Sequence, residues 1–181
     1  TEEITGLDLV EWQIRVARGE DLPKKQDELS INGHAMEVRV YAEDTMNGFT
    51  PDIGKLLRYR VPSGQSVRVD DAFIEGMEIP IYYDPMIAKL VVWDENRDLA
   101  IEGLHHALHN YEIHGIKNNI MYLHTLLNTD HFKQNKISTH FCQNNNDELM
   151  RKMREDKLEI PAALFQISFV LFELKRKKVK L

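Results

Sequence analysis

The chain has 181 residues, enough for one globular domain with an appendage. Hydrophobic residues make up 43% and charged residues 29%, which argues against a disordered, collagen-like or coiled-coil chain. The 23 basic and 29 acidic residues give a net charge of −6, whereas a general nucleic-acid-binding protein is normally basic. The single cysteine, Cys142, excludes an intrachain disulfide framework and a cysteine-only zinc site.

The amino terminus has the character of an excised segment. The first residue is Thr1, and no basic region followed by an apolar run comes after it. We therefore expect the sequence to be a piece of a longer protein.

The first predicted helix spans residues 6–18. Thr5 can cap this helix, with Asp8 three residues later in a capping-box arrangement. Gly19 suits the position after the helix, and Pro23 blocks its continuation. The apolar face consists of residues at helical spacing, namely Leu7, Val10, Ile14 and Ala17.

A β region follows the helix. Apolar and polar residues alternate over residues 34–42, which predicts a strand with one buried face. Residues 55–60 and 66–69 are typical of short strands separated by a turn. Residues 86–93 are almost continuously apolar and predict a strand buried on both faces.

Two helices are predicted after the strands. Asn96 or Asp98 can cap the first helix, and the second follows the pair Asn118-Asn119. A helix, several antiparallel strands and two further helices define an α+β fold with a small antiparallel sheet, not a βαβ repeat. The apolar side of the first of these two helices carries Ala100, Leu104, Ala107, Leu108 and Tyr111, and that of the second carries Ile120, Met121, Leu123 and Leu127.

A polar segment at residues 143–147 predicts a linker. We therefore expect a lobe of residues 1–145 and a helical extension of residues 146–181, and we expect removal of residues 147–181 to leave the lobe stable. Residues 161–174 are mostly apolar but fall short of the ~20 residues of a membrane-spanning helix, so we expect protein to cover them. The basic residues 175–180 favour the carboxyl-terminal end of that helix, or alternatively contact phosphates or an anionic membrane.

The histidines and the cysteine each allow a functional and a structural interpretation. His105 and His109 are four residues apart, with His106 and His114 nearby, a spacing that can chelate a metal. A carboxylate and a clear third ligand are missing, so we favour a solvated helix face and predict no metal site. Cys142 lacks an orienting third group, and we predict a structural role for it.

Seven motifs follow one another in order: Thr1-Glu2-Glu3-Ile4-Thr5-Gly6, Gly33-His34-Ala35-Met36-Glu37-Val38-Arg39, Ala42-Glu43-Asp44, Val67-Arg68, Tyr82-Tyr83-Asp84, Asn96-Arg97-Asp98 and Gly115-Ile116-Lys117-Asn118-Asn119. Together they resemble the C-terminal lobe of biotin carboxylase, the ATP-grasp enzyme that carboxylates biotin. The resemblance covers roughly residues 1–142. The segments 79–81 and 137–141 are most similar to the α subunits of acyl-CoA carboxylases, the propionyl-CoA type among them.

This resemblance implies an enzyme that uses ATP, bicarbonate and Mg²⁺ or Mn²⁺ to carboxylate biotin. It implies that the guanidinium of Arg68 stabilises negative charge developing on the ureido oxygen, a task that suits a planar, permanently charged group. The residues alone leave the alternative of a surface strand arginine paired with Asp70 or Asp71. The resemblance also implies that Ile137 lines an adenine pocket and that Arg97 lies at a homodimer interface.

The implied partners are the N-terminal ATP-grasp portion of the same chain, a biotin carboxyl carrier domain and a carboxyltransferase subunit. Since the resemblance assigns the phosphate, metal and base residues to positions before Thr1, we expect the 181 residues alone to be inactive. It implies a location in the bacterial cytoplasm or the mitochondrial matrix. One alternative is a protein–protein interaction module whose C-terminal helix docks on a partner subunit. Another is a membrane or nucleic-acid binder that uses the basic tail, although we expect no partner of either kind.

Overall fold

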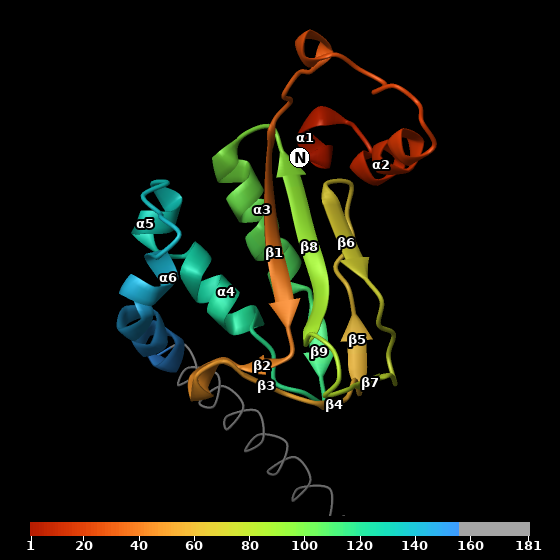
Figure 1. Ribbon diagram of the computed structural model, residues 1–181. Helices are drawn as coiled ribbons and strands as arrows, with labels where there is room; N and C mark the ends of the chain where they lie inside the picture. Colours follow the sequence, from red (N-terminus) through yellow and green to blue (C-terminus); the bar gives the residue numbers. More distant parts are fainter. Residues whose placement is uncertain (156–181) are drawn as a thin grey trace, which may run out of the picture. The chain divides into compact units, whose positions relative to one another are not determined.

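The computed structural model describes residues 1–155 (Figure 1). The chain divides into two compact units, one of residues Thr1–Leu127 and one that begins at Asn128. The apolar segment 161–174 and the basic segment 175–180 lie outside the described residues.

A three-stranded antiparallel sheet forms the centre of the first unit. Its order is β1 (His34–Tyr41), β8 (Met86–Asp94) and β6 (Val67–Asp71), so that β8 is the middle strand. The strands predicted over residues 34–42 and 86–93 are confirmed, and Met36, Val40 and Ala42 are buried as the alternation indicates. The strand predicted over 66–69 is also present, shifted by one residue at its start.

The two faces of this sheet differ in how far residues 1–155 cover them. Helix α3 (Arg97–His109) packs against β8 and β1 (Figure 1). On β8, Ala88, Leu90 and Val92 are fully buried, whereas the alternate residues Lys89 and Val91 are only half-buried. The prediction of a strand buried on both faces is therefore wrong for this part of β8, because the helix covers a single face.

The two predicted helices of the first unit are confirmed. Asn96 caps α3 by accepting a hydrogen bond from the Leu99 amide at 3.1 Å, and all five predicted apolar positions of this segment are buried. Helix α4 (Ile120–Leu127) follows Asn119, whose buried side chain accepts from the Tyr41 amide and donates to the Arg39 carbonyl. These bonds satisfy backbone hydrogen-bonding groups of β1 next to the point where its register with β8 shifts. On α4, Leu127 is buried as predicted, but Ile120, Met121 and Leu123 are only half-buried.

The helix predicted over residues 6–18 is divided. A short helix α1 (Glu2–Thr5) ends at Gly6, whose φ of 67° is the left-handed conformation that favours glycine. Helix α2 (Leu9–Ala17) then begins, capped by Asp8, which accepts from the Glu11 amide at 2.8 Å. The proposed cap at Thr5 is wrong because its hydroxyl donates back to the Thr1 carbonyl.

Three two-stranded ribbons and two short 3-10 turns complete the first unit. The predicted strand 55–60 is split between two ribbons, and the strand β9 (Glu112–His114) was not predicted. The ribbons pair β2 (Glu43–Asp44) with β3 (Thr50–Pro51), β4 (Gly54–Lys55) with β7 (Glu78–Ile79), and β5 (Arg58–Arg60) with β9; the turns are η1 (Gln26–Glu28) and η2 (Thr45–Asn47). The α+β class is confirmed.

The second unit is helical where it is described. It contains α5 (Asp130–Lys133), α6 (Phe141–Asn144) and a helix over 146–155. Phe141, Leu149 and Met153 are buried. The helix over 146–155 falls within the helical extension predicted for residues 146–181, and the domain boundary near residue 145 stays a prediction. No helix within residues 1–155 is long and apolar enough to cross a membrane.

Candidate active site around Arg68

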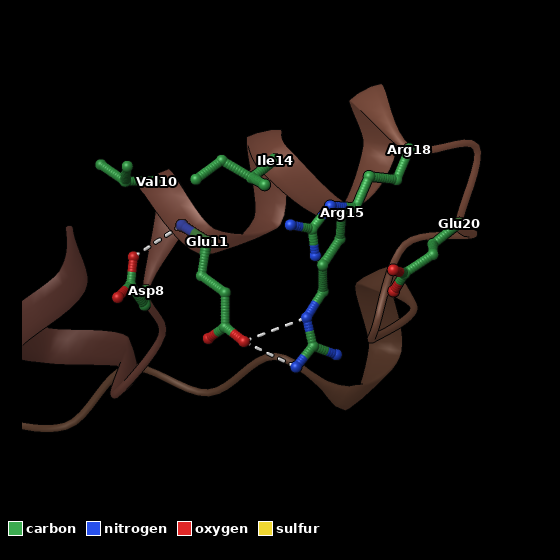
Figure 2. A pocket seen from close by; sticks show the side chains of 7 residues that line it. All are labelled: Asp8, Val10, Glu11, Ile14, Arg15, Arg18 and Glu20. Atoms are coloured by element: carbon green, nitrogen blue, oxygen red, sulfur yellow. Dashed lines mark hydrogen bonds and ion pairs between the residues drawn. The ribbon is translucent and has the colours of Figure 1, made fainter.

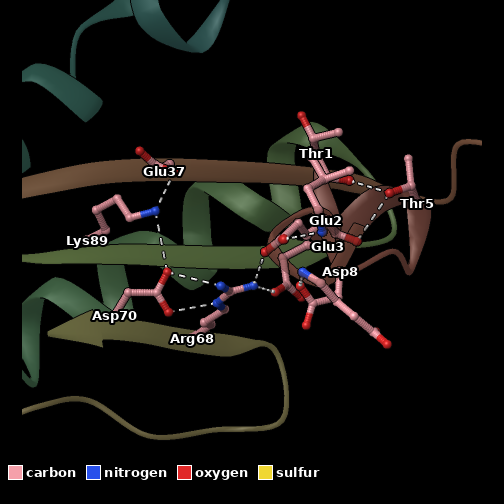
Figure 3. Close-up of polar contacts among 11 residues, drawn as sticks. Thr1, Glu2, Glu3, Thr5, Asp8, Glu37, Arg68, Asp70 and Lys89 are labelled. Atoms are coloured by element: carbon pink, nitrogen blue, oxygen red, sulfur yellow. Dashed lines mark hydrogen bonds and ion pairs between the residues drawn. The ribbon is translucent and has the colours of Figure 1, made fainter. Parts of the chain in front are cut away.

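Arg68 lies on β6, on the sheet face that α3 does not cover. Its neighbour in register on the middle strand is Val91, and the next pair on this face is Asp70 with Lys89. Glu37 of β1 lies in register with Val91 from the other side. The open face therefore presents a row of charged side chains that crosses all three strands (Figure 3).

The guanidinium of Arg68 forms a two-point ion pair with Asp70. Its Nε donates to Oδ1 at 2.8 Å and its Nη2 donates to Oδ2 at 3.1 Å. Because alternate residues of a strand point to the same face, the spacing of two residues allows this contact. The sequence-based prediction of an ion pair with Asp70 or Asp71 is confirmed for Asp70. Lys89 adds a second cation, with Nζ 3.4 Å from Asp70 Oδ2 and 4.0 Å from Glu37 Oε2.

Two further carboxylates come from helix α1. The Nη1 of Arg68 donates to Glu2 Oε2 at 2.7 Å and to Glu3 Oε1 at 3.3 Å (Figure 3). The other oxygen of Glu2 accepts the Leu9 amide at 2.8 Å, at the start of α2. Local sequence patterns do not connect these glutamates with Arg68. The only signal was their presence in the first of the seven motifs.

The surrounding charges shift the pKa values of these groups in opposite directions. Hydrogen bonds to Asp70 and then to Glu2 raise the pKa of Arg68 above its already high ordinary value. Hydrogen bonds from Arg68 lower the pKa of Asp70 and, together with the Leu9 amide, that of Glu2. All three groups are therefore charged at neutral pH, and the guanidinium is held by fixed negative charge.

Two shallow hollows border Arg68. One, of about 290 Å³, has the open sheet face as its floor, with Val91 and Lys89 among its lining residues. The other, of about 510 Å³, lies toward Gly6, Leu7 and Asp8. The Arg68 side chain is 41% exposed, so a ligand entering either hollow can reach it.

A third hollow, of about 610 Å³, runs along helix α2 (Figure 2). Val10 and Ile14 line it and are 62% and 49% exposed, although the sequence predicted an apolar face for them. Glu11 and Arg15 pair across one turn of the helix at 2.6 Å. Leu9 and Trp12 of this helix are half-buried, but within the described residues Val10 and Ile14 stay uncovered.

The other predicted site residues lie outside β6. Arg97 is half-buried in the first turn of α3, and Ile137 is an exposed residue of the second unit. Neither contact predicted for them is tested by the structure. Cys142 is a free, exposed thiol at α6.

The histidines do not form a solvated helix face as a group. His105 is half-buried, and its Nδ1 lies 3.0 Å from Nδ1 of His124 on α4, so the solvated interpretation is wrong for this residue. His106 and His109 are exposed, as expected. Within residues 1–155, no three His, Cys, Asp or Glu side chains are placed to hold a metal ion.

The α+β fold corresponds to a known class of domain. Residues 37–144 match the biotin carboxylase C-terminal domain, and the chain belongs to this family. Its relatives include acyl-CoA carboxylases, as the sequence predicted. The α subunit of mitochondrial methylcrotonoyl-CoA carboxylase from Oryza sativa subsp. japonica is 46% identical over 83% of this chain, and the biotin carboxylase of Halalkalibacterium halodurans is 46% identical over 80%.

Solved structures agree with this assignment. The biotin carboxylase domain dimer of Hydrogenobacter thermophilus 2-oxoglutarate carboxylase, in complex with MgADP, ADP and bicarbonate, is 40% identical and superposes on 82% of this chain with a TM-score of 0.79. This chain spans only part of its relatives: 20% of the rice subunit, 32% of the bacterial biotin carboxylase and 33% of the Hydrogenobacter chain.

Proposed function

We propose that this chain is the C-terminal lobe of the biotin-carboxylating component of a biotin-dependent acyl-CoA carboxylase. The observation that supports this most directly is the Arg68 guanidinium, fixed by carboxylates on an open sheet face in a chain of this family. The complete enzyme would carboxylate biotin at the expense of ATP and bicarbonate.

The Arg68 site fits the ureido group of biotin. The guanidinium is partly exposed beside two hollows, so an oxygen atom can approach it. Biotin, when bound, supplies the ureido nitrogen that accepts the carboxyl group and an oxygen on which negative charge develops. Arg68 donates hydrogen bonds to that oxygen, and a preorganised donor of this kind stabilises developing charge because it needs no reorientation during the reaction.

The remaining functions belong to other parts of the complex. ATP and Mg²⁺ or Mn²⁺ would be held mainly by an ATP-grasp portion of the same chain, with Ile137 at the wall of the adenine pocket. A carrier domain would deliver biotin and a carboxyltransferase subunit would use the product. We propose Arg97 as part of a homodimer interface, and a mitochondrial location in a eukaryote or a cytoplasmic one in a bacterium. The 181 residues alone would be inactive.

Replacement of Arg68 tests the proposal. In the full-length chain, Arg68→Ala should lower the rate of biotin carboxylation about 10²–10³-fold, the effect of removing one donor to a developing oxyanion. The melting temperature should hardly change, since exposed ion pairs contribute only about 0–1 kcal/mol. Arg15→Ala, which removes an arginine from an exposed ion pair on α2, is the matched control. Unchanged carboxylation by Arg68→Ala would refute the proposed role.

A docking module remains the second candidate. The uncovered apolar side of α2 and its hollow favour an interaction surface in the lobe itself (Figure 2). The predicted docking helix of residues 161–174 lies outside the described residues. Activity of the full-length chain that is independent of Arg68 would favour docking as the main role of this lobe.

A further inference from the structure

The three carboxylates around Arg68 are not equivalent. Asp70 uses both of its oxygens on the guanidinium, at 2.8 and 3.1 Å. Glu2 also uses both oxygens, one on Arg68 Nη1 at 2.7 Å and one on the Leu9 amide at 2.8 Å. Glu3 makes a single, longer contact of 3.3 Å to the same Nη1. Two of the three carboxylates are thus fixed at both oxygens, and the third is held at one.

The anchored carboxylates approach the guanidinium from different elements. Asp70 belongs to β6, is 34% exposed and is held in turn by Lys89 of β8. Glu2 belongs to α1, is 23% exposed and is tied to the first residue of α2. Because the two anchors lie on separate elements, together they fix both the position and the tilt of the guanidinium plane.

The hydrogen-bond inventory of the guanidinium leaves room for a ligand. Arginine has five N–H groups. Asp70 uses the Nε–H and one N–H of Nη2, while Glu2 and Glu3 both lie at Nη1. Among residues 1–155, the second N–H of Nη2 makes no further hydrogen bond. This N–H lies on the edge of the guanidinium that Nη1 and Nη2 share. A ligand oxygen can bind this edge with two hydrogen bonds if it replaces the weaker contact at Nη1.

We propose that Glu2 and Asp70 are positioning residues that hold the Arg68 guanidinium for the ureido oxygen, and that Glu3 is the contact which this oxygen replaces. The inference rests on the proposed function of Arg68. It assigns separate roles to carboxylates that look alike in the sequence: two are anchors and one is exchangeable.

Amide variants in the full-length carboxylase test this assignment. Glu2→Gln and Asp70→Asn keep the size of the side chain, but an amide has only one acceptor oxygen and cannot make both bonds. Both variants should lower kcat of biotin carboxylation by about 10²-fold, the scale expected for a misplaced catalytic group, with little change in the KM for biotin. Glu3→Gln should keep kcat and should not raise that KM, because its one contact is exchangeable.

A partial reaction and a control separate positioning from folding. ATP cleavage measured with bicarbonate but without biotin should be unchanged in Glu2→Gln and Asp70→Asn, because Arg68 acts on biotin. Glu11→Gln, a glutamate of an exposed ion pair on α2, should behave as wild type in both assays. If Asp70→Asn proves unstable, Glu2→Gln carries the test, since Glu2 reaches Arg68 from another element.

The outcomes also separate this inference from the proposed function. Wild-type kcat in Glu2→Gln and Asp70→Asn, with a large loss in Arg68→Ala, would overturn the positioning role and leave the function of Arg68 standing. A loss in Glu3→Gln equal to that in Glu2→Gln would overturn the distinction between anchors and exchangeable contact. Full activity in Arg68→Ala would refute the function on which the inference rests.

Discussion

At the scale of single residues, the Arg68 network places three carboxylates around one guanidinium on the open face of the sheet. Arg68 is 41% exposed and Glu3 is 33% exposed, so water screens these pairs and their contribution to stability is small. A network that contributes little to stability but fixes one side chain at three points is typical of a site that positions a group for binding.

The pKa values of this network predict how its contribution depends on pH. Hydrogen bonds from Arg68 lower the pKa of Asp70 and of Glu2 in the folded state. Their stabilisation is therefore complete above the unfolded carboxyl pKa of about 4 and is lost as the pH falls through the lower folded values. The free energy of unfolding lost in Arg68→Ala should be larger at pH 7 than at pH 3, as measured by urea titration. A loss of equal size at both values would show that the ion pairs do not stabilise the folded state.

A buried pair of tyrosines gives the second prediction at this scale. The Tyr59 hydroxyl lies 2.6 Å from Asp71 Oδ2 and 2.8 Å from the Tyr111 hydroxyl. The carboxylate can only accept, so Tyr59 donates to Asp71 and accepts from Tyr111. Burial raises the pKa of Tyr111 to about 12, so it stays protonated. Tyr59→Phe leaves the buried Tyr111 donor unpaired and should lower the free energy of unfolding by about 1–3 kcal/mol.

The matched control for Tyr59→Phe is Tyr82→Phe. Tyr82 is 82% exposed, so its hydroxyl is hydrated and its removal should change stability by less than about 0.5 kcal/mol. Chemical denaturation of both variants measures the difference. Equal effects of the two substitutions would contradict the assigned hydrogen-bond chain.

At the scale of elements, helix α2 is only partly packed, so its cap contributes a large share of its stability. It buries no residue, and its amino-terminal end is satisfied by Asp8, which accepts from the Glu11 amide. Asp8→Ala should weaken the helix by about 1 kcal/mol, the usual cost of losing a cap. The loss should appear as faster amide hydrogen exchange within residues 9–17, with the global melting temperature unchanged. Asp21→Ala, in the exposed segment after the helix, is the control. A large fall in melting temperature for Asp8→Ala would contradict the prediction, because it would mean that α2 unfolds together with the sheet.

Local patterns predicted those elements whose signals lie within a few residues. The alternation in β1, the apolar run of β8 and the Asn96 cap of α3 each specify their own segment. The division of the first helix depends on the left-handed conformation of Gly6, which its sequence permits but does not require.

The long-range contacts could not be predicted in the same way. Arg68 and Asp70 are two residues apart on one strand, so strand geometry brings them together. Glu2 is 66 residues from Arg68 in sequence, and their contact requires α1 to lie beside the sheet. The half-buried face of β8 likewise depends on which elements pack above it, and this is a property of the tertiary structure.

At the scale of the whole chain, the candidate site is contained in one unit. Arg68 and its partners Glu2, Glu3, Asp70 and Lys89 all belong to residues Thr1–Leu127. The family match over 37–144 nevertheless continues into the second unit. Residues 128–144 of the second unit are therefore part of the family domain in sequence.

The buried residues of the helix over 146–155 predict where the chain can be shortened. Leu149 and Met153 are completely buried, and each buried side chain of this size contributes about 1.5–3 kcal/mol. A chain that ends at residue 145 should therefore melt at a lower temperature than one that ends at residue 155. This argues against the expectation that removal of residues 147–181 leaves the stability unchanged.

A point substitution shows whether the buried side chains of this helix, and not merely the length of the chain, determine the stability. Leu149→Ala in the complete 181-residue chain removes buried methyl groups and should cost about 2–5 kcal/mol, whereas Arg151→Ala removes only an exposed ion pair of the same helix. Calorimetry of the two truncations and the two substitutions provides the comparison. If Leu149→Ala and the chain ending at residue 145 both melt as the full chain does, residues 146–155 lie outside the cooperative fold, and the boundary near residue 145 predicted from the sequence is correct. If Leu149→Ala and the chain ending at residue 145 are both destabilised, the cooperative fold extends to residue 155. The polar segment 143–147 is then not a domain boundary, since the buried side chains Leu149 and Met153 come after it.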